Sequence, residues 1–155
     1  MELSNILAKG SIINCAKVTS KRQLLQQCAN QIEQDIGVSS QLIFNSLMAR
    51  EQLGSTGLGN GIAIPHGKLD NINGITAVFV RLEHPIDFDS VDDMPVDLVF
   101  MLIAPTGSGA DHLKALALVA RLLRDDNITK LLRQTNDSDK LYQTLTAPTQ
   151  NINAA

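Results

Sequence analysis

The amino-acid sequence predicts an α/β fold, a single-domain sandwich in which a mixed, mostly parallel β-sheet is flanked by helices on both faces. Helical and strand-like patterns alternate along the chain, which is typical of this architecture. One apolar run, VDLVFMLIA at residues 96–104, is nearly continuous, as in a central strand that is covered on both faces. The 155 residues, 44% hydrophobic and 19% charged, suit one globular domain spanning residues 1–155.

The first part of the chain predicts two helices. Ser20 followed three residues later by Gln23 is a capping-box pattern, and apolar residues then repeat at helical spacing until Gly37, which can end the helix. A second helix is expected to run through Glu51, with Ser39 or Ser40 as its cap. It places Arg50 in its last turn.

The middle of the chain predicts a shaped loop followed by two strands. Residues 54–67, GSTGLGNGIAIPHG, hold five of the ten glycines, so a long regular element is not expected in this glycine loop. A short strand is expected inside it at residues 62–64. Two runs rich in Val, Ile, Leu and Phe, residues 75–82 and 96–104, predict β-strands.

Three further helices are expected after these strands. Apolar residues recur at i, i+3, i+7 and i+10 from residue 113, with Asp111 as the expected N-cap. Shorter helices are predicted over residues 128–133 and 138–145. From about residue 147 onward we expect a frayed tail.

Composition excludes several classes of function. The net charge is −3, the basic residues are scattered, and aromatic content is 3%, so neither a basic stripe nor a base-stacking platform for nucleic acid is present. Cys15 and Cys28 lack metal-like spacing and are expected to be reduced thiols. Because no export signal or membrane-length apolar run is visible, we expect a cytoplasmic protein without membrane insertion.

The glycine loop and the three histidines also admit other chemistries, which their spacing argues against. The loop lacks the G-x-x-x-x-G-K-[ST] string of nucleotide-binding loops and opens a strand rather than a helix. His66, His84 and His112 show no paired ligand spacing, so no metal is expected. The chain has no G-x-S-x-G string of serine hydrolases. We therefore expect no bound cofactor, and His84 is interpreted as a surface residue in a turn.

His66 is the candidate nucleophile. Its imidazole is largely uncharged at neutral pH and carries a lone pair that can attack phosphorus. Pro65 fixes the backbone before it, and Gly67 after it is expected to remove side-chain bulk where a donor protein approaches. The sequence therefore predicts a ring presented at the surface.

Transfer of a phosphoryl group needs a cation near the acceptor, because the transition state spreads charge over three oxygens. Arg50, at the end of a helix that leads into the glycine loop, is the expected cation. His112 lies in the first turn of a later helix, whose positive end favours a phosphate and a neutral ring. Simpler interpretations remain open: Arg50 as a solvated helix-end charge and His112 as an ordinary helix-start residue.

The segment REQLGSTGLGNGIAIPHGK, residues 50–68, closely resembles the phosphorylation-site signature of the mannitol, fructose and nitrogen-regulatory enzyme IIA family of the bacterial phosphotransferase system. No structural reason is apparent from the sequence for so specific a string. The likeness continues through Phe88-Asp89, the PVDL segment at residues 95–98 and the pair His112-Leu113. It implies that His66 becomes a tele-phosphohistidine, phosphorylated on Nε2, with Arg50 and His112 beside it.

The resemblance also implies partners and a pathway. The donor would be a small histidine-containing phosphocarrier protein, fed from phosphoenolpyruvate, and the target a regulated transporter, a kinase or an enzyme IIB. The stand-alone form and the REQLGSTGLGNGIAIPHGKL string look most like the nitrogen-regulatory branch. Two alternatives remain: a sugar-specific enzyme IIA that passes phosphate to an enzyme IIB, and a purely regulatory module whose binding is switched by phosphorylation of His66.

Overall fold

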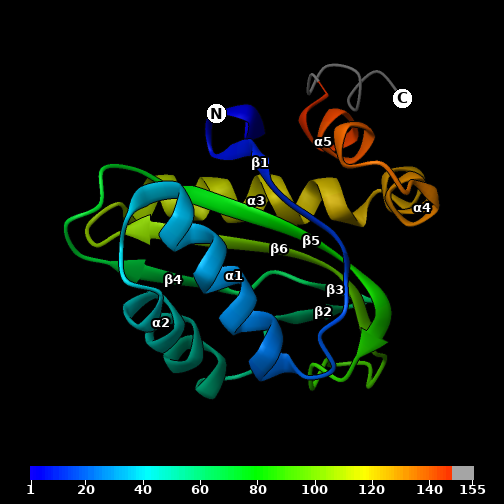
Figure 1. Cartoon of the computed structure of the whole chain (residues 1–155), viewed down its shortest axis with the longest axis horizontal. Helices are drawn as coiled ribbons and strands as arrows, with labels where there is room; N and C mark the ends of the chain where they lie inside the picture. The colour runs from blue at the N-terminus through cyan, green and yellow to red at the C-terminus, as the bar shows by residue number, and fades with distance from the viewer. Residues whose placement is uncertain (148–155) are drawn as a thin grey trace.

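The computed structural model describes residues 1–147, and the expected frayed tail lies outside the described residues. A six-stranded sheet runs through the centre in the order β1-β5-β6-β3-β2, and β4 also pairs with β6 (Figure 1). The strands are β1 (Leu7–Ala16), β2 (Gly57–Gly59), β3 (Ile62–Ala63), β4 (His66–Leu69), β5 (Thr76–Ile86) and β6 (Val96–Pro105). Three of the five pairings are parallel, namely β1 with β5, β3 with β6 and β4 with β6. The mixed, mostly parallel sheet predicted from the sequence is confirmed.

Helices cover both faces of this sheet, also as predicted. On one face lie α1 (Lys21–Ile36) and α2 (Ser40–Gln52). The other face carries the short 3-10 helix η1 (Leu3–Asn5) together with α3 (Gly109–Arg124), α4 (Asp126–Gln134) and α5 (Ser138–Thr146). Figure 1 shows the sheet between α1 in front and α3 behind.

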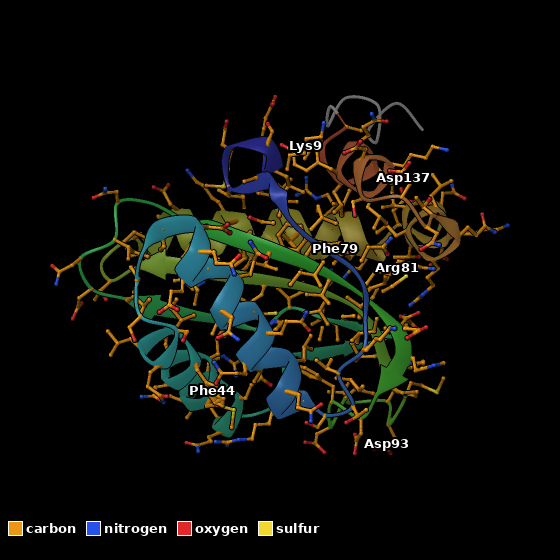
Figure 2. The ribbon with its side chains drawn as sticks, in the orientation of Figure 1. Lys9, Phe44, Phe79, Arg81, Asp93 and Asp137 are labelled. Atoms are coloured by element: carbon orange, nitrogen blue, oxygen red, sulfur yellow. The ribbon has the colours of Figure 1, made fainter. Side chains whose placement is uncertain are left out.

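The central strand β6 supplies both cores, because side chains alternate between the faces of a strand. Val99, Met101 and Ile103 pack under α1 and α2, whereas Phe100 and Leu102 pack under α3. All five are fully buried, each contributing roughly 1.5–3 kcal/mol of hydrophobic stabilisation. Figure 2 labels one aromatic residue from each core, Phe44 on α2 and Phe79 on β5.

Helix α1 begins and ends as the sequence predicts. The Ser20 side chain accepts a hydrogen bond from the Gln23 backbone N–H at 3.1 Å, and Gly37 ends the helix with φ of 74°. The predicted cap of α3 is wrong. That helix begins at Gly109, two residues before Asp111, and Ser108 occupies its N-cap position without a side-chain hydrogen bond.

The sequence missed β1, the edge strand that pairs with β5. Its register shifts twice against β5, between Leu7 and Ile12 and again between Ile13 and Ala16, and Cys15 has a positive φ of 55°. These irregularities break the period-two alternation that identifies a strand. Strand β2, inside the glycine loop, and strand β4, which begins at the end of that loop, were also missed, because only the strand seen as β3 was expected there.

Candidate active site

His66 lies where one strand of the sheet is interrupted and resumes. β3 pairs with the start of β6 and β4 with its end, so that Ala63 stands opposite Val99 and His66 opposite Leu102. Ile64 and Pro65 form the break, and the Pro65 carbonyl accepts a hydrogen bond from the Leu102 N–H at 3.0 Å. Proline suits this position because it has no N–H to satisfy. The backbone at His66 is therefore fixed by the central strand.

The imidazole of His66 is half-buried and is oriented by its own chain. Nδ1 lies 2.9 Å from the carbonyl oxygen of Ile64. Because a carbonyl only accepts, the proton of the neutral ring is assigned to Nδ1, which leaves the lone pair on Nε2. Burial lowers the pKa of His66, and the positive charges of Arg50 and Lys68 lower it further. The hydrogen bond to the Ile64 carbonyl and the charge of Glu51 raise the pKa, but the net shift is downward. At neutral pH the ring is uncharged, with a free lone pair on the tele nitrogen.

His112 lies beside His66. The ring centroids are 5.5 Å apart and the planes meet at 74°, an edge-on arrangement. His112 is only 5% exposed, and its Nε2 is buried without a hydrogen-bond partner among the described residues. Burial is the largest cause that lowers the pKa of His112, and the nearby His66 and Lys68 lower it further. The ring is therefore neutral mainly because it is buried. An orphaned buried nitrogen costs roughly 1–3 kcal/mol, which a ligand at this position would recover.

Arg50 comes from the last turn of α2, as the sequence predicts. Its Nη1 donates a hydrogen bond to the Gly54 carbonyl at 2.8 Å, which holds the guanidinium at the first residue of the glycine loop. The three predicted residues His66, His112 and Arg50 line one open hollow of about 370 Å³, which we call the histidine hollow. Its remaining lining residues are Ala49, Leu53, Lys68, Leu113 and Leu116.

Sequence reasoning missed two features of the histidine hollow. Lys68 follows His66 by two residues in β4 and therefore shares its face of the strand, a spacing that could have identified it. The rim is apolar: Leu53 is 84% exposed and Leu113 is 68% exposed. Leu53 stands beside the glycine loop and Leu113 beside His112, but leucines at or near a helix are ordinarily assigned to the core.

Gly67 has a different role from the one predicted. The residue is buried, and a Cβ placed on it would lie 2.3 Å from the Ser46 Oγ of α2. That hydroxyl donates to the Lys68 carbonyl at 2.9 Å and accepts from the Lys68 N–H at 3.1 Å. The prediction that Gly67 makes room for an approaching protein is wrong. Glycine is required because α2 packs directly on the backbone of β4.

Several residues of the signature segment 50–68 have a structural role, although none was apparent from the sequence. The Glu51 carboxylate accepts hydrogen bonds from both the backbone N–H and the hydroxyl of Thr56. Ser55 Oγ donates to the Phe88 carbonyl at 2.6 Å. A Cβ at Gly57 would lie 2.2 Å from Ser90 Oγ. These contacts fix the path of the glycine loop.

The other candidates lie elsewhere. His84 is exposed and belongs to strand β5 rather than to a turn. Among residues 1–147 there is no cluster of three or more His, Cys, Asp or Glu side chains arranged to hold a metal ion. None of the helices in this described part of the chain has the length and apolar character needed to cross a membrane.

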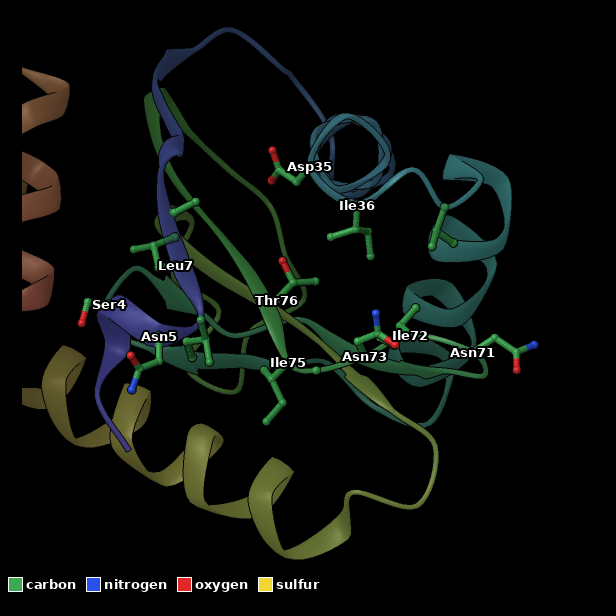
Figure 3. Close-up of a pocket in the computed structure, with 14 residues that line it drawn as sticks. Ser4, Asn5, Leu7, Asp35, Ile36, Asn71, Ile72, Asn73, Ile75 and Thr76 are labelled. Atoms are coloured by element: carbon green, nitrogen blue, oxygen red, sulfur yellow. The ribbon is translucent and has the colours of Figure 1, made fainter.

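A second hollow, of about 400 Å³, opens at the starts of β1 and β5 and the end of α1 (Figure 3). It is lined by asparagine side chains and by Asp35, whose carboxylate already accepts hydrogen bonds from Ser11 at 2.6 Å and Gln31 at 3.0 Å. It shares no lining residue with the histidine hollow. The histidine hollow, with His66 and His112, is therefore separate from this second hollow.

An α/β sandwich with two neutral imidazoles and an arginine around one hollow can be compared with known families. The family model described as "Phosphoenolpyruvate-dependent sugar phosphotransferase system, EIIA 2" matches residues 5–147. The chain belongs to this family. The match covers the sheet, the helices and every residue of the histidine hollow.

Within the family, the similarity is to nitrogen regulatory proteins. The nitrogen regulatory protein of Bradyrhizobium diazoefficiens is 48% identical over 148 residues, covering 96% of this chain and 97% of that protein. The crystal structure of nitrogen regulatory protein IIA-Ntr from Neisseria meningitidis superposes with a TM-score of 0.89 at 33% identity, covering 93% of this chain and 99% of that one.

More distant members share the fold. Enzyme IIA for mannitol from Escherichia coli, solved as a complex with phosphorylated enzyme IIB for mannitol, gives a TM-score of 0.75 at 21% identity and covers 91% of this chain and 96% of that chain. At this identity the likeness concerns the fold alone.

Proposed function

We propose that this protein is a phosphocarrier that accepts a phosphoryl group on Nε2 of His66 from the phosphohistidine of a small histidine-containing phosphocarrier protein, and that it acts as a nitrogen or metabolic regulator in the cytoplasm. The observation that carries the proposal is the 2.9 Å contact of His66 Nδ1 with the Ile64 carbonyl oxygen. Because the carbonyl can only accept, the proton of the neutral ring is assigned to Nδ1 and the free lone pair to Nε2, in a ring that lines the histidine hollow. Membership of the family supports the same chemistry.

The transfer balances without a cofactor. The Nε2 lone pair forms the new N–P bond while the N–P bond to the donor imidazole breaks, and the donor ring keeps the electron pair of that bond. Nδ1 of His66 retains its proton throughout. The phosphorylated ring is therefore cationic, and the hydrogen bond from Nδ1 to the Ile64 carbonyl stabilises that charge.

Arg50 and His112 have complementary roles in this proposal. The guanidinium of Arg50 remains charged and offers several N–H donors to the phosphoryl oxygens. The orphaned Nε2 of His112, when it carries the proton of the neutral ring, donates one more hydrogen bond and gains the partner that it lacks. Lys68 adds positive charge at the same hollow. These groups meet the need for fixed positive electrostatics around the three oxygens.

The apolar rim favours a protein as donor. Leu53 and Leu113 both line the hollow and are largely exposed, and exposed apolar groups of this size are typical of protein contacts. A small-molecule donor such as a nucleotide would gain little from them. Desolvation by a docked protein would also strengthen every electrostatic contact inside the hollow.

The test is phosphorylation in a reconstituted system. The protein is incubated with phosphoenolpyruvate, enzyme I and the phosphocarrier, and the modified residue is located by mass spectrometry. His66→Ala should abolish acceptance while the fold is retained, Arg50→Ala should slow transfer roughly tenfold or more, and His112→Ala should impair it. Labelling of another side chain in His66→Ala would refute the proposal.

Two alternatives are decided by what happens after phosphorylation. The mannitol enzyme IIA structure was solved with a phosphorylated enzyme IIB, so a sugar-pathway role predicts transfer from His66 to an enzyme IIB. A purely regulatory module predicts no transfer but altered binding to a transporter or kinase, because the phosphoryl group places negative charge next to the apolar rim. The regulatory names of the similar proteins support a regulatory role, whether or not the phosphoryl group is passed on.

A further inference from the structure

Glu51 follows Arg50 directly in the sequence, yet the two side chains have opposite environments. Arg50 lines the histidine hollow, whereas the Glu51 side chain is only 3% exposed. Burying a carboxylate is unfavourable unless charged and hydrogen-bonding partners replace the water that it loses. The contacts of Glu51 therefore show what this carboxylate holds in place.

All the polar contacts of Glu51 converge on one turn and one lysine. Its Oε1 lies 2.9 Å from Lys21 Nζ and accepts a hydrogen bond from the Thr56 N–H at 3.1 Å. Its Oε2 accepts a hydrogen bond from the Thr56 hydroxyl. Lys21 is itself held, since its Nζ lies 4.6 Å from the centre of the Phe88 ring. The carboxylate thus ties the end of α2 to the exit of the turn at residues 53–56.

The Arg50 guanidinium depends on this turn for its position. Its Nη1 donates to the Gly54 carbonyl at 2.8 Å. Apart from its own N–H, which donates to the Glu51 carbonyl at 3.1 Å, Gly54 has no close packing: the residue is exposed, its φ is 143°, and no atom lies within 4 Å of the position of a Cβ. The carbonyl is located by its neighbours in the chain, namely the end of α2 on one side and Thr56 on the other.

We propose that Glu51 is a positioning residue for the phosphoryl transfer proposed above: by holding the 53–56 turn it keeps the Gly54 carbonyl, and through it the Arg50 guanidinium, beside His66. Glu51 itself does not contact the phosphoryl group. A guanidinium held before the donor docks requires less reorganisation in the transition state than a free one. This inference rests on the proposed role of Arg50.

The test is a double-mutant cycle on single-turnover transfer from the phosphorylated phosphocarrier. Glu51→Ala should slow transfer roughly tenfold to a hundredfold when Arg50 is present. In the Arg50→Ala background the same change should have an effect of less than about twofold, because residues that act through one another are not additive. Glu51→Gln should retain most of the rate, since its amide oxygen can still accept from the Thr56 N–H.

Two further variants guard against a purely structural effect. Like Glu51, Glu33 accepts a hydrogen bond from a backbone N–H at a turn, here the N–H of Ser40 at 2.9 Å. The Glu33→Ala variant should accept the phosphoryl group at the wild-type rate. Should Glu51→Ala fail to fold, as judged by circular dichroism and urea unfolding, Thr56→Val removes one of the two donors and should still slow transfer only when Arg50 is present.

The possible failures are distinguishable. Equal slowing by Glu51→Ala with and without Arg50 would overturn the inference about Glu51 and leave His66 as the acceptor. A wild-type rate in Arg50→Ala would overturn both the role of Arg50 and this inference. Labelling that persists in His66→Ala would overturn the proposed function itself.

Discussion

Replacing Gly67 with alanine tests how closely helix α2 is held against strand β4. The new Cβ would lie 2.3 Å from Ser46 Oγ and 3.2 Å from Ser46 Cβ, so rotation of the hydroxyl alone does not remove the overlap. Ser46 must give up its two hydrogen bonds to Lys68, at roughly 0.5–1.5 kcal/mol each, and some overpacking strain remains. We expect the free energy of unfolding to fall by roughly 2–4 kcal/mol, and the melting temperature by roughly 5–15 °C for a chain of this length.

The assay is urea or thermal unfolding followed by circular dichroism, with Gly74→Ala as the matched control. No atom lies within 4 Å of a Cβ at Gly74, and its backbone is outside the left-handed region, so this change should be neutral or slightly stabilising. Replacing Ser46 with alanine removes the closest atom and should reduce the cost of Gly67→Ala by half or more. A stability of Gly67→Ala within about 0.5 kcal/mol of wild type would refute the packing argument.

Three other predictions concern protonation, reactivity and an ion pair. Because burial holds the pKa of His66 below its ordinary value of 6.5, phosphoryl acceptance should change little between pH 7 and 8, and it should fall as the pH drops through the lowered pKa and Nε2 takes up a proton; a transfer rate that rises severalfold from pH 7 to 8 would contradict this. Burial raises the pKa of the Cys28 thiol to about 12, so iodoacetamide at pH 8 should modify Cys15 in the folded protein and Cys28 only after unfolding, as peptide mass spectrometry would show. Asp97→Ala removes a carboxylate that Arg133 contacts through Nε at 2.9 Å and Nη2 at 2.9 Å, and should lower the free energy of unfolding in urea by roughly 1–2 kcal/mol; an unchanged urea midpoint would show that this half-exposed pair contributes nothing.

The sequence predicted those elements whose periodicity is undisturbed. Helix α1 has both a serine N-cap and a C-terminal glycine, and β6 is apolar almost throughout because helices cover both of its faces. Strand β1 was missed because two register shifts and a left-handed Cys15 destroy its alternation. The false cap at Asp111 has a similar origin, since an acidic residue in a first turn interacts favourably with the helix dipole whether or not it caps the helix.

Prediction of the histidine hollow was limited in a different way. His66, Arg50 and His112 each stand near the end of a regular element, and the resemblance of residues 50–68 and of the His112-Leu113 pair to the family signature predicted that they lie together. Lys68 shares the strand face of His66, but β4 itself was not predicted, and Leu53 reaches the hollow only because β4 packs beside α2, a tertiary relation that no local pattern encodes. The role of Gly67 was misjudged for the same reason, because its neighbour Ser46 is distant in the sequence.

The contacts of the glycine loop suggest why the chemistry and the packing of this protein are difficult to change separately. Gly67 lets α2, which carries Arg50, lie directly on β4, which carries His66. Glu51 then fixes the turn that receives the Arg50 side chain. Neither Gly67 nor Glu51 needs to contact a phosphoryl group. Each helps to set the position of the Arg50 guanidinium relative to the His66 imidazole, the two groups proposed to bind the phosphoryl group. A substitution at either position should therefore alter transfer through geometry even where the fold survives, and its effect should depend on whether Arg50 is present.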